Sequence, residues 1–243
     1  MDKSTIGFCG YPDPYIINKL KVQYPDACWV DLDVELSFVP DYKILPQVYC
    51  KIIKNIVNNA VYYKDKLITI IMATGREKCD SAALASVILK NMGFNIIETK
   101  YENIETIKKE PIISTSSLPL VEKIQLITKE IIEPIDKTQL NRVNPRFGFW
   151  GVPPNDLSIL NLFPDDTHVY GWTRCVEMGV PACYETEIMV DENVPTVFYS
   201  QAFCAKASLA KYLSFKYNGL YVDIDDIATN SIVAKIEAFI NLR

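Results

Sequence analysis

The residues best suited to chemistry in this sequence are its seven cysteines, which stand beside a single histidine, His168. No two cysteines are spaced as C-x-x-C, so the spacings of zinc ribbons and ferredoxins are absent. In a reducing compartment, cysteines serve as thiols, metal ligands or catalytic groups more often than as disulfides. A single histidine excludes sites that need several imidazoles, and we expect His168 to be an ordinary half-buried side chain of a strand.

Composition narrows the class of protein further. The formal net charge is −5 over 243 residues, so nucleic acid is not an expected partner. Hydrophobic residues make up 49% of the chain, which is enough to form real cores. No apolar run reaches the roughly 18 residues that a membrane span needs, and the opening Met1-Asp2-Lys3 does not have the form of a signal peptide. The sequence therefore predicts a soluble, cytoplasmic protein that has no membrane partner.

Two stretches with the common skeleton G-F-x-G-x-P organise the chain. The first begins at Gly7 and the second at Gly148, and each joins an apolar strand to a helix-like segment. Strands alternate with helices in both halves, which is typical of parallel sheets. We expect an α/β fold of two related Rossmann-like lobes, whose mostly parallel sheets face a central cleft. The expected domains are an N-terminal lobe with its linking helix, 1–140, and a C-terminal lobe, 141–243.

The pattern of apolar residues predicts where the individual elements lie. Residues 102–119 are expected to hold a short helix with loops, and residues 173–177 a polar loop. The strands are predicted at 5–8, 27–32, 67–72, 95–98, 147–152, 167–172, 196–200 and 220–224. The helices are predicted at 14–23, 47–63, 81–91, 120–133 and 156–162, from about 206 to 217, and from 227 onward.

Five cysteines are expected at one edge of these sheets. In parallel α/β sheets, ligands bind beyond the carboxyl ends of the strands. Four of the five follow predicted strands, and the other opens a helix, where the N-terminus favours a thiolate. The five residues are Cys9, Cys50, Cys79, Cys175 and Cys204.

Three of these edge cysteines are the stronger candidates for metal or cluster ligands. Cys9, Cys50 and Cys204 each lie at a strand end or helix start, next to glycine, proline or polar residues. Cys28, inside a strand, and Cys183, which lacks such a context, are expected to be small buried hydrophobic residues.

Two acidic residues close the second predicted strand. Asp31 and Asp33 stand where an acid can hold a ribose hydroxyl in nucleotide-binding folds. The glycine-rich G-x-G-x-x-G loop of those folds is missing. A metal-free binder of a nucleotide or a sugar therefore remains an alternative in which the cysteines have no special role.

Short segments around the cysteines carry a family resemblance. They are Ile6–Ile17 with Cys9, Leu45–Cys50, Cys79–Ser81, Ser200–Cys204, and Lys235–Ile240 at the closing helix. In order and context they resemble the component subunits of 2-hydroxyacyl-CoA dehydratases, which are related to benzoyl-CoA reductase subunits. The resemblance implies two α/β lobes with a [4Fe-4S] cluster between them. Carried over by position, its ligands would be Cys9, Cys50 and Cys204, with Cys79 or Cys175 as replacements.

The resemblance also implies a chemistry and partners. A cubane held by three thiolates leaves one iron open, which suits low-potential electron transfer to a small-molecule substrate in a reductase or radical dehydratase. In the family, an ATP-dependent activator protein supplies the electron, and the enzymes are heterodimers. For this chain, a homodimer and a heterodimer both stay open. Groups expected to line the cluster are Tyr11, Trp150, Arg174 and Glu177.

Two departures from the family pattern leave the substrate open. The family's helical segment before the first cysteine turn is missing, and the connection between the lobes is short, so the sequence does not decide whether the substrate is a CoA thioester. The alternative function is a non-catalytic accessory protein of the same fold, which carries a cluster or binds a small ligand.

Overall fold

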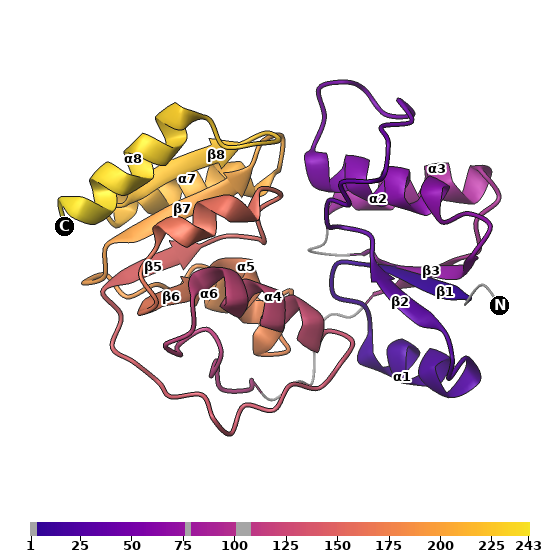
Figure 1. The fold of residues 1–243 in the computed structure, drawn as a ribbon, viewed down its shortest axis with the longest axis horizontal. Coiled ribbons are helices and arrows are strands. Elements are labelled where there is room, and N and C mark those ends of the chain that lie inside the picture. The colour runs from indigo at the N-terminus through magenta and orange to yellow at the C-terminus, as the bar shows by residue number, and fades with distance from the viewer. Residues whose placement is uncertain (1–3, 76–78, 101–107) are drawn as a thin grey trace. The chain divides into compact units, whose positions relative to one another are not determined.

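The computed structural model describes residues 4–75, 79–100 and 108–243, which form two compact units, Met1–Glu102 and Asn103–Arg243 (Figure 1). Each unit contains one four-stranded, all-parallel sheet flanked by helices. The predicted α/β class with two Rossmann-like lobes is therefore confirmed. In the part of the chain that is described, no helix combines the length and the apolar character needed to cross a membrane.

The first unit has its sheet in the order β2-β1-β3-β4. Helices α2 and α3 cover one face of this sheet and α1 lies on the other (Figure 1). The strands are β1 (Thr5–Cys9), β2 (Cys28–Asp31), β3 (Leu67–Ala73) and β4 (Ile96–Thr99). The helices are α1 (Pro14–Gln23), α2 (Lys51–Tyr62) and α3 (Asp80–Asn91).

Local sequence explains these elements. The β-branched run in β3 is buried between helices on both faces, as expected of a central parallel strand. Helix α1 begins after Asp13, whose carboxylate accepts a hydrogen bond from the Tyr15 N–H at 2.8 Å, and Pro14 occupies the first turn. Apolar residues of α2, such as Ile53 and Val57, recur at helical spacing and pack against the sheet.

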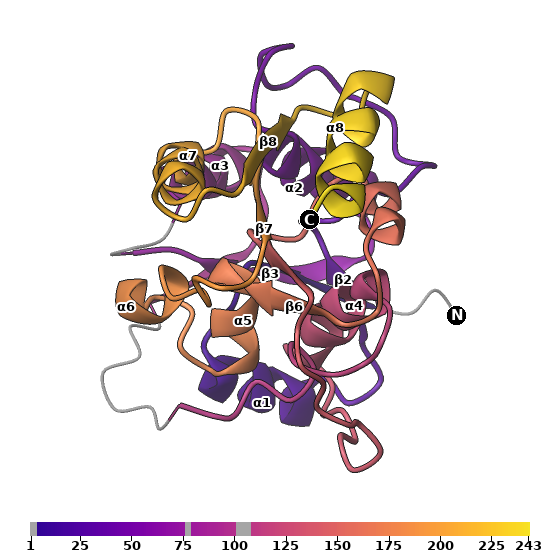
Figure 2. The ribbon, with the colours of Figure 1, turned by 90° about the vertical axis from the view of Figure 1, so that its left-hand side faces the viewer.

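The second unit repeats the strand order of the first, as β6-β5-β7-β8. Figure 2 shows α7 on one side of this sheet and α8 on the other. The strands are β5 (Phe147–Trp150), β6 (Thr167–Tyr170), β7 (Thr196–Gln201) and β8 (Leu220–Ile224). The helices are α4 (Leu120–Glu130), the 3-10 helix η1 (Leu157–Leu162), α5 (Gly171–Glu177), α6 (Tyr184–Glu187), α7 (Lys206–Lys216) and α8 (Asn230–Asn241).

Three features differ from the sequence prediction. The boundary between the units lies after Glu102 rather than after residue 140. Helix α4, expected in the N-terminal lobe, buries Leu120 and Ile124 in the core of the second unit, because they pack against β5, β6 and β7. Residues 173–177 belong to a helix, α5, and not to a loop. Of the segment 102–119, where a short helix was expected, residues 102–107 lie outside the described residues, and 108–119 contain a turn at 112–115 but no helix.

Candidate functional site

The carboxyl edge of the first sheet begins with the turn after β1. Cys9 ends the strand, and Gly10 follows with φ +65°. Any other residue at position 10 would be held in an unfavourable backbone conformation. Its Cβ would also lie 3.2 Å from the Cβ of Ala73. The Gly10 N–H donates a hydrogen bond to Asp33 Oδ2 at 2.7 Å. The Cys9 turn is thereby joined to the end of the neighbouring strand, β2.

Helix α2 fixes the segment that carries the two acidic residues. The Asp33 N–H donates to Asp31 Oδ1 at 2.9 Å. Asn59 Nδ2 donates to the carbonyl oxygens of Leu32 at 3.0 Å and Val34 at 2.9 Å, and the Asn55 side chain donates to the Asp33 carbonyl at 3.0 Å. Neither asparagine was predicted from the sequence. Their signal is an i, i+4 pair of polar residues on the buried face of an apolar helix.

Strands β3 and β4 bring two threonines to the same edge. The Asp13 N–H donates to Thr99 Oγ1 at 3.2 Å, which ties the start of α1 to the end of β4. The Thr74 N–H donates to the Thr99 carbonyl at 2.9 Å. The Thr74 hydroxyl is buried and, among the described residues, has no hydrogen-bond partner. All four strands therefore end in polar or thiol groups, two of which, Thr74 and Thr99, sequence reasoning did not identify.

Burial and like charge raise the pKa values at this edge. Burial raises the pKa of Asp31 to about 6. The pKa of Asp33 is also raised, first by burial and then by the charge of Asp31. Burial, followed by the two carboxylates, holds the pKa of the Cys9 thiol well above its usual value. Cys9 is thus a neutral thiol at physiological pH, and a bound cation would be needed to make it a thiolate.

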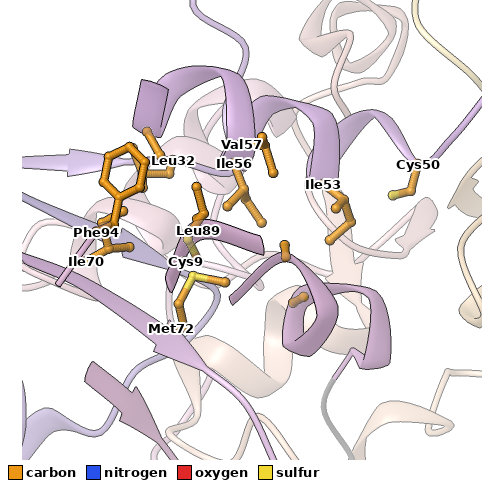
Figure 3. Packing of buried hydrophobic residues seen from close by; sticks show 13 residues of the cluster. Cys9, Leu32, Cys50, Ile53, Ile56, Val57, Ile70, Met72, Leu89 and Phe94 are labelled. Carbon is orange, nitrogen blue, oxygen red and sulfur yellow. The ribbon is translucent and has the colours of Figure 1, made fainter. Parts of the chain in front are cut away.

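Cys50 shares a core cluster with Cys9 but occupies a different part of it. Cys50 is buried and immediately precedes the first turn of α2. Figure 3 shows Cys9 near Met72 and Leu89, and Cys50 farther along the cluster, with Ile53 between the two cysteines in this view. Both thiols therefore belong to the packed interior of the first unit.

The other cysteines occupy varied positions. Cys204 is half-buried in the turn after β7, where its N–H donates to the Gln201 carbonyl at 3.1 Å. Cys79 is exposed immediately before α3. Cys175 is buried within α5, and Cys183 is half-buried. The expectation that Cys28 is buried is wrong: it lies on β2, an edge strand of its sheet, and its side chain is exposed.

Three of the four groups expected to line a cluster have internal partners within the second unit. Trp150 is fully buried, and its Nε1 donates to the Glu187 carbonyl at 2.7 Å. Arg174 donates to the Thr186 carbonyl at 2.7 Å. Glu177 is buried and accepts hydrogen bonds from the backbone of the segment 113–114. These contacts hold the fold of the second unit together. The fourth group, Tyr11, is half-buried in the turn after Cys9.

The histidine, His168, is buried in β6, and its Nε2 lies 2.8 Å from the Val143 carbonyl.

The predicted ligand set is divided between the two units. Cys9 and Cys50 belong to the first unit and Cys204 to the second. Across residues 4–75, 79–100 and 108–243, no three His, Cys, Asp or Glu side chains are grouped so that they could hold a metal ion. The assignment of these three cysteines as ligands therefore stays a prediction. Neither a family model nor a curated protein sequence matches the chain.

Proposed function

We propose that the chain is a cytoplasmic iron–sulfur redox protein in which Cys9, Cys50 and Cys204 hold a [4Fe-4S] cluster. The observation that supports this most is the placement of two buried thiols, Cys9 at the end of β1 and Cys50 at the start of α2, in one unit. Cys204 supplies a third thiol from the turn after a strand of the second unit. When bound, the cluster would supply low-potential electron transfer to a small-molecule substrate.

The donor chemistry suits such a cluster, because [4Fe-4S] clusters are held by cysteine thiolates. All seven cysteines are thiols and not disulfides. The raised pKa of Cys9 means that iron binding must displace a proton from this residue, so loading should be less favourable at lower pH. Asp33 would position the Cys9 turn through its hydrogen bond to the Gly10 N–H. The proposed activity is that of a reductase or radical dehydratase, with an ATP-dependent activator protein as electron donor and a homodimer or heterodimer as the assembly.

Iron and acid-labile sulfide analysis after anaerobic purification tests the proposal. The wild type should contain about four irons per chain, the content of one cubane. Cys9→Ala, Cys50→Ala and Cys204→Ala should each lose the cluster. Cys28→Ala is the matched control, because Cys28 is exposed on an edge strand and should keep its iron. If one of the three variants keeps its iron, that ligand is wrong, and Cys79 or Cys175 becomes the next to replace.

A second candidate is a metal-free protein that binds a small polar ligand at the carboxyl edge of the first sheet. The buried Thr74 hydroxyl, which has no hydrogen-bond partner in the described chain, favours this candidate. A colourless, iron-free protein, even after reconstitution with iron and sulfide, would refute the cluster and support this candidate.

A further inference from the structure

Two cysteines outside the proposed ligand set lie close together in the second unit. The Cys175 thiol is directed at the carbonyl oxygen of Cys183, with a sulfur–oxygen distance of 4.0 Å. The backbone between them folds back through two hydrogen bonds, from the Val180 N–H to the Cys175 carbonyl at 2.9 Å and from the Cys183 N–H to the Val180 carbonyl at 3.1 Å. This turn brings the two residues to the same end of α5.

The two thiols differ in their access to solvent. Cys175 is only 1% exposed, and burial raises its pKa to about 12, so it stays protonated. Cys183 is half-buried. Its Sγ lies 3.1 Å from Thr186 Oγ1 and 3.3 Å from Glu185 Oε2, in polar surroundings. Oxidation of thiols follows exposure and thiolate character, so an oxidant from solvent should reach Cys183 first.

We propose that Cys175 and Cys183 form an oxidisable thiol pair that hydrogen peroxide converts to a disulfide within the second unit. The Cys183 sulfur attacks one peroxide oxygen, the O–O bond breaks, and a sulfenic acid and water result. The Cys175 sulfur then attacks the sulfenic sulfur, and the hydroxyl group leaves with the Cys175 proton as a second water. Two thiols and one peroxide thus give one disulfide and two waters. A thiol reductant reverses the change by exchange.

A neutral disulfide suits this position. It requires no charge at the buried Cys175, where a thiolate is strongly disfavoured. For the bond to form, the Cys183 side chain must turn from Thr186 and Glu185 toward Cys175. Cys183 immediately precedes the four-residue helix α6, so this motion needs only a local change at the start of a short element.

Peptide mapping of the reduced full-length protein after peroxide treatment tests the pair. Trypsin leaves Cys175, Cys183 and Cys204 in one peptide, because there is no lysine or arginine between Arg174 and Lys206. Cleavage after glutamate separates all three, because Glu177 and Glu185 flank Cys183 on its two sides. We expect peroxide to leave the Cys175 and Cys183 peptides joined, with a mass lower by two hydrogen atoms, until a reductant is added.

Cysteine variants test the order in which the two thiols are oxidised. In Cys175→Ser, Cys183 should accumulate as a sulfenic acid that dimedone traps, whereas in Cys183→Ser the Cys175 thiol should remain unoxidised. Cys175→Ala serves as a second variant if the serine disturbs the buried site, and Cys28→Ser is the control that should leave the linked peptides unchanged. The proposal is overturned if Cys183 links to Cys204 or any other cysteine, or if both thiols remain alkylatable after peroxide.

Discussion

The buried carboxylate of Glu177 should make a large contribution to the stability of the second unit. Its Oε1 accepts a hydrogen bond from the Ile113 N–H at 2.6 Å, and its Oε2 accepts from the Ser114 N–H at 2.9 Å and the Ser114 hydroxyl at 2.6 Å. Lys137 Nζ lies 3.6 Å from the same carboxylate. Glu177→Ala would leave two buried backbone N–H groups without their acceptor.

The expected loss follows from these contacts. Hydrogen bonds to a charged group contribute about 1.5–3 kcal/mol each and are not additive, and a buried donor left unpaired costs about 1–3 kcal/mol. Removal of one partner of a buried ion pair typically costs about 3–5 kcal/mol. We therefore expect Glu177→Ala to lower the free energy of unfolding of the second unit by about 3–5 kcal/mol, a large part of the stability of a typical domain.

Urea unfolding followed by tryptophan fluorescence measures this loss. Trp150 and Trp172 report on the second unit, and a Trp29→Phe background removes the signal of the first. Glu133→Ala is the control, because the ion pair of Glu133 with Lys129, at 3.3 Å, is exposed and should contribute less than about 0.5 kcal/mol. If Glu177→Ala costs no more than this control, the carboxylate does not hold the 113–114 segment in place.

Three further predictions concern the fold around the sites. The raised pKa of Asp31, about 6 against 3.8, means that the folded first unit binds a proton more tightly than the unfolded chain, so its stability should fall by up to about 3 kcal/mol as pH rises through this window. Unfolding across the window should show that fall, and Asp31→Asn should reduce it. Gly148→Ala would place a Cβ 2.4 Å from Thr196 Oγ1 and 2.5 Å from the Tyr170 ring, so it should destabilise the second unit by about 1–3 kcal/mol in urea unfolding. Asn59→Ala removes two hydrogen bonds to the segment 32–34, and amide hydrogen exchange there should become faster.

Each of these three has an outcome that contradicts it. If the stability of the first unit instead rises with pH between about 4 and 6, burial does not destabilise the charged form of the Asp31 carboxyl group. A urea midpoint unchanged in Gly148→Ala would mean that β5 and β7 can separate without cost. Exchange at 32–34 that is unaffected by Asn59→Ala would show that other contacts hold this segment.

Local sequence patterns were sufficient to predict most of the fold. The β-branched run of β3 and the two G-F-x-G-x-P turns predict central parallel strands, and β1 and β5 occupy the same position in their sheets. Helix α5 could not be predicted in this way. Its segment 171–177 is short and partly polar, and Thr173 and Glu177 are buried through hydrogen bonds to residues distant in the sequence, which no local pattern reveals.

The candidate site could be predicted only in part, because the topology of a parallel sheet places residues at an edge but does not orient their side chains. The rule that parallel strands end at one edge is sufficient to place Cys9, Asp31 and Asp33 near one another. The rule does not give the direction of a side chain, so it could not predict that Cys9 packs into the core or that its pKa is raised as a result. Burial of Cys28 failed as a prediction because the position of β2 at the edge of the sheet depends on strand order.

The division of the chain after Glu102 has a consequence for biosynthesis. The first unit is continuous in sequence and has its own sheet and core, and such units generally fold as they leave the ribosome, N-terminal unit first. Cys9 and Cys50 would then be enclosed before Cys204 has been translated. A centre that needs thiols from both units could be loaded only after synthesis is complete, by a delivery system that reopens the first unit or reaches its thiols from the edge of the sheet.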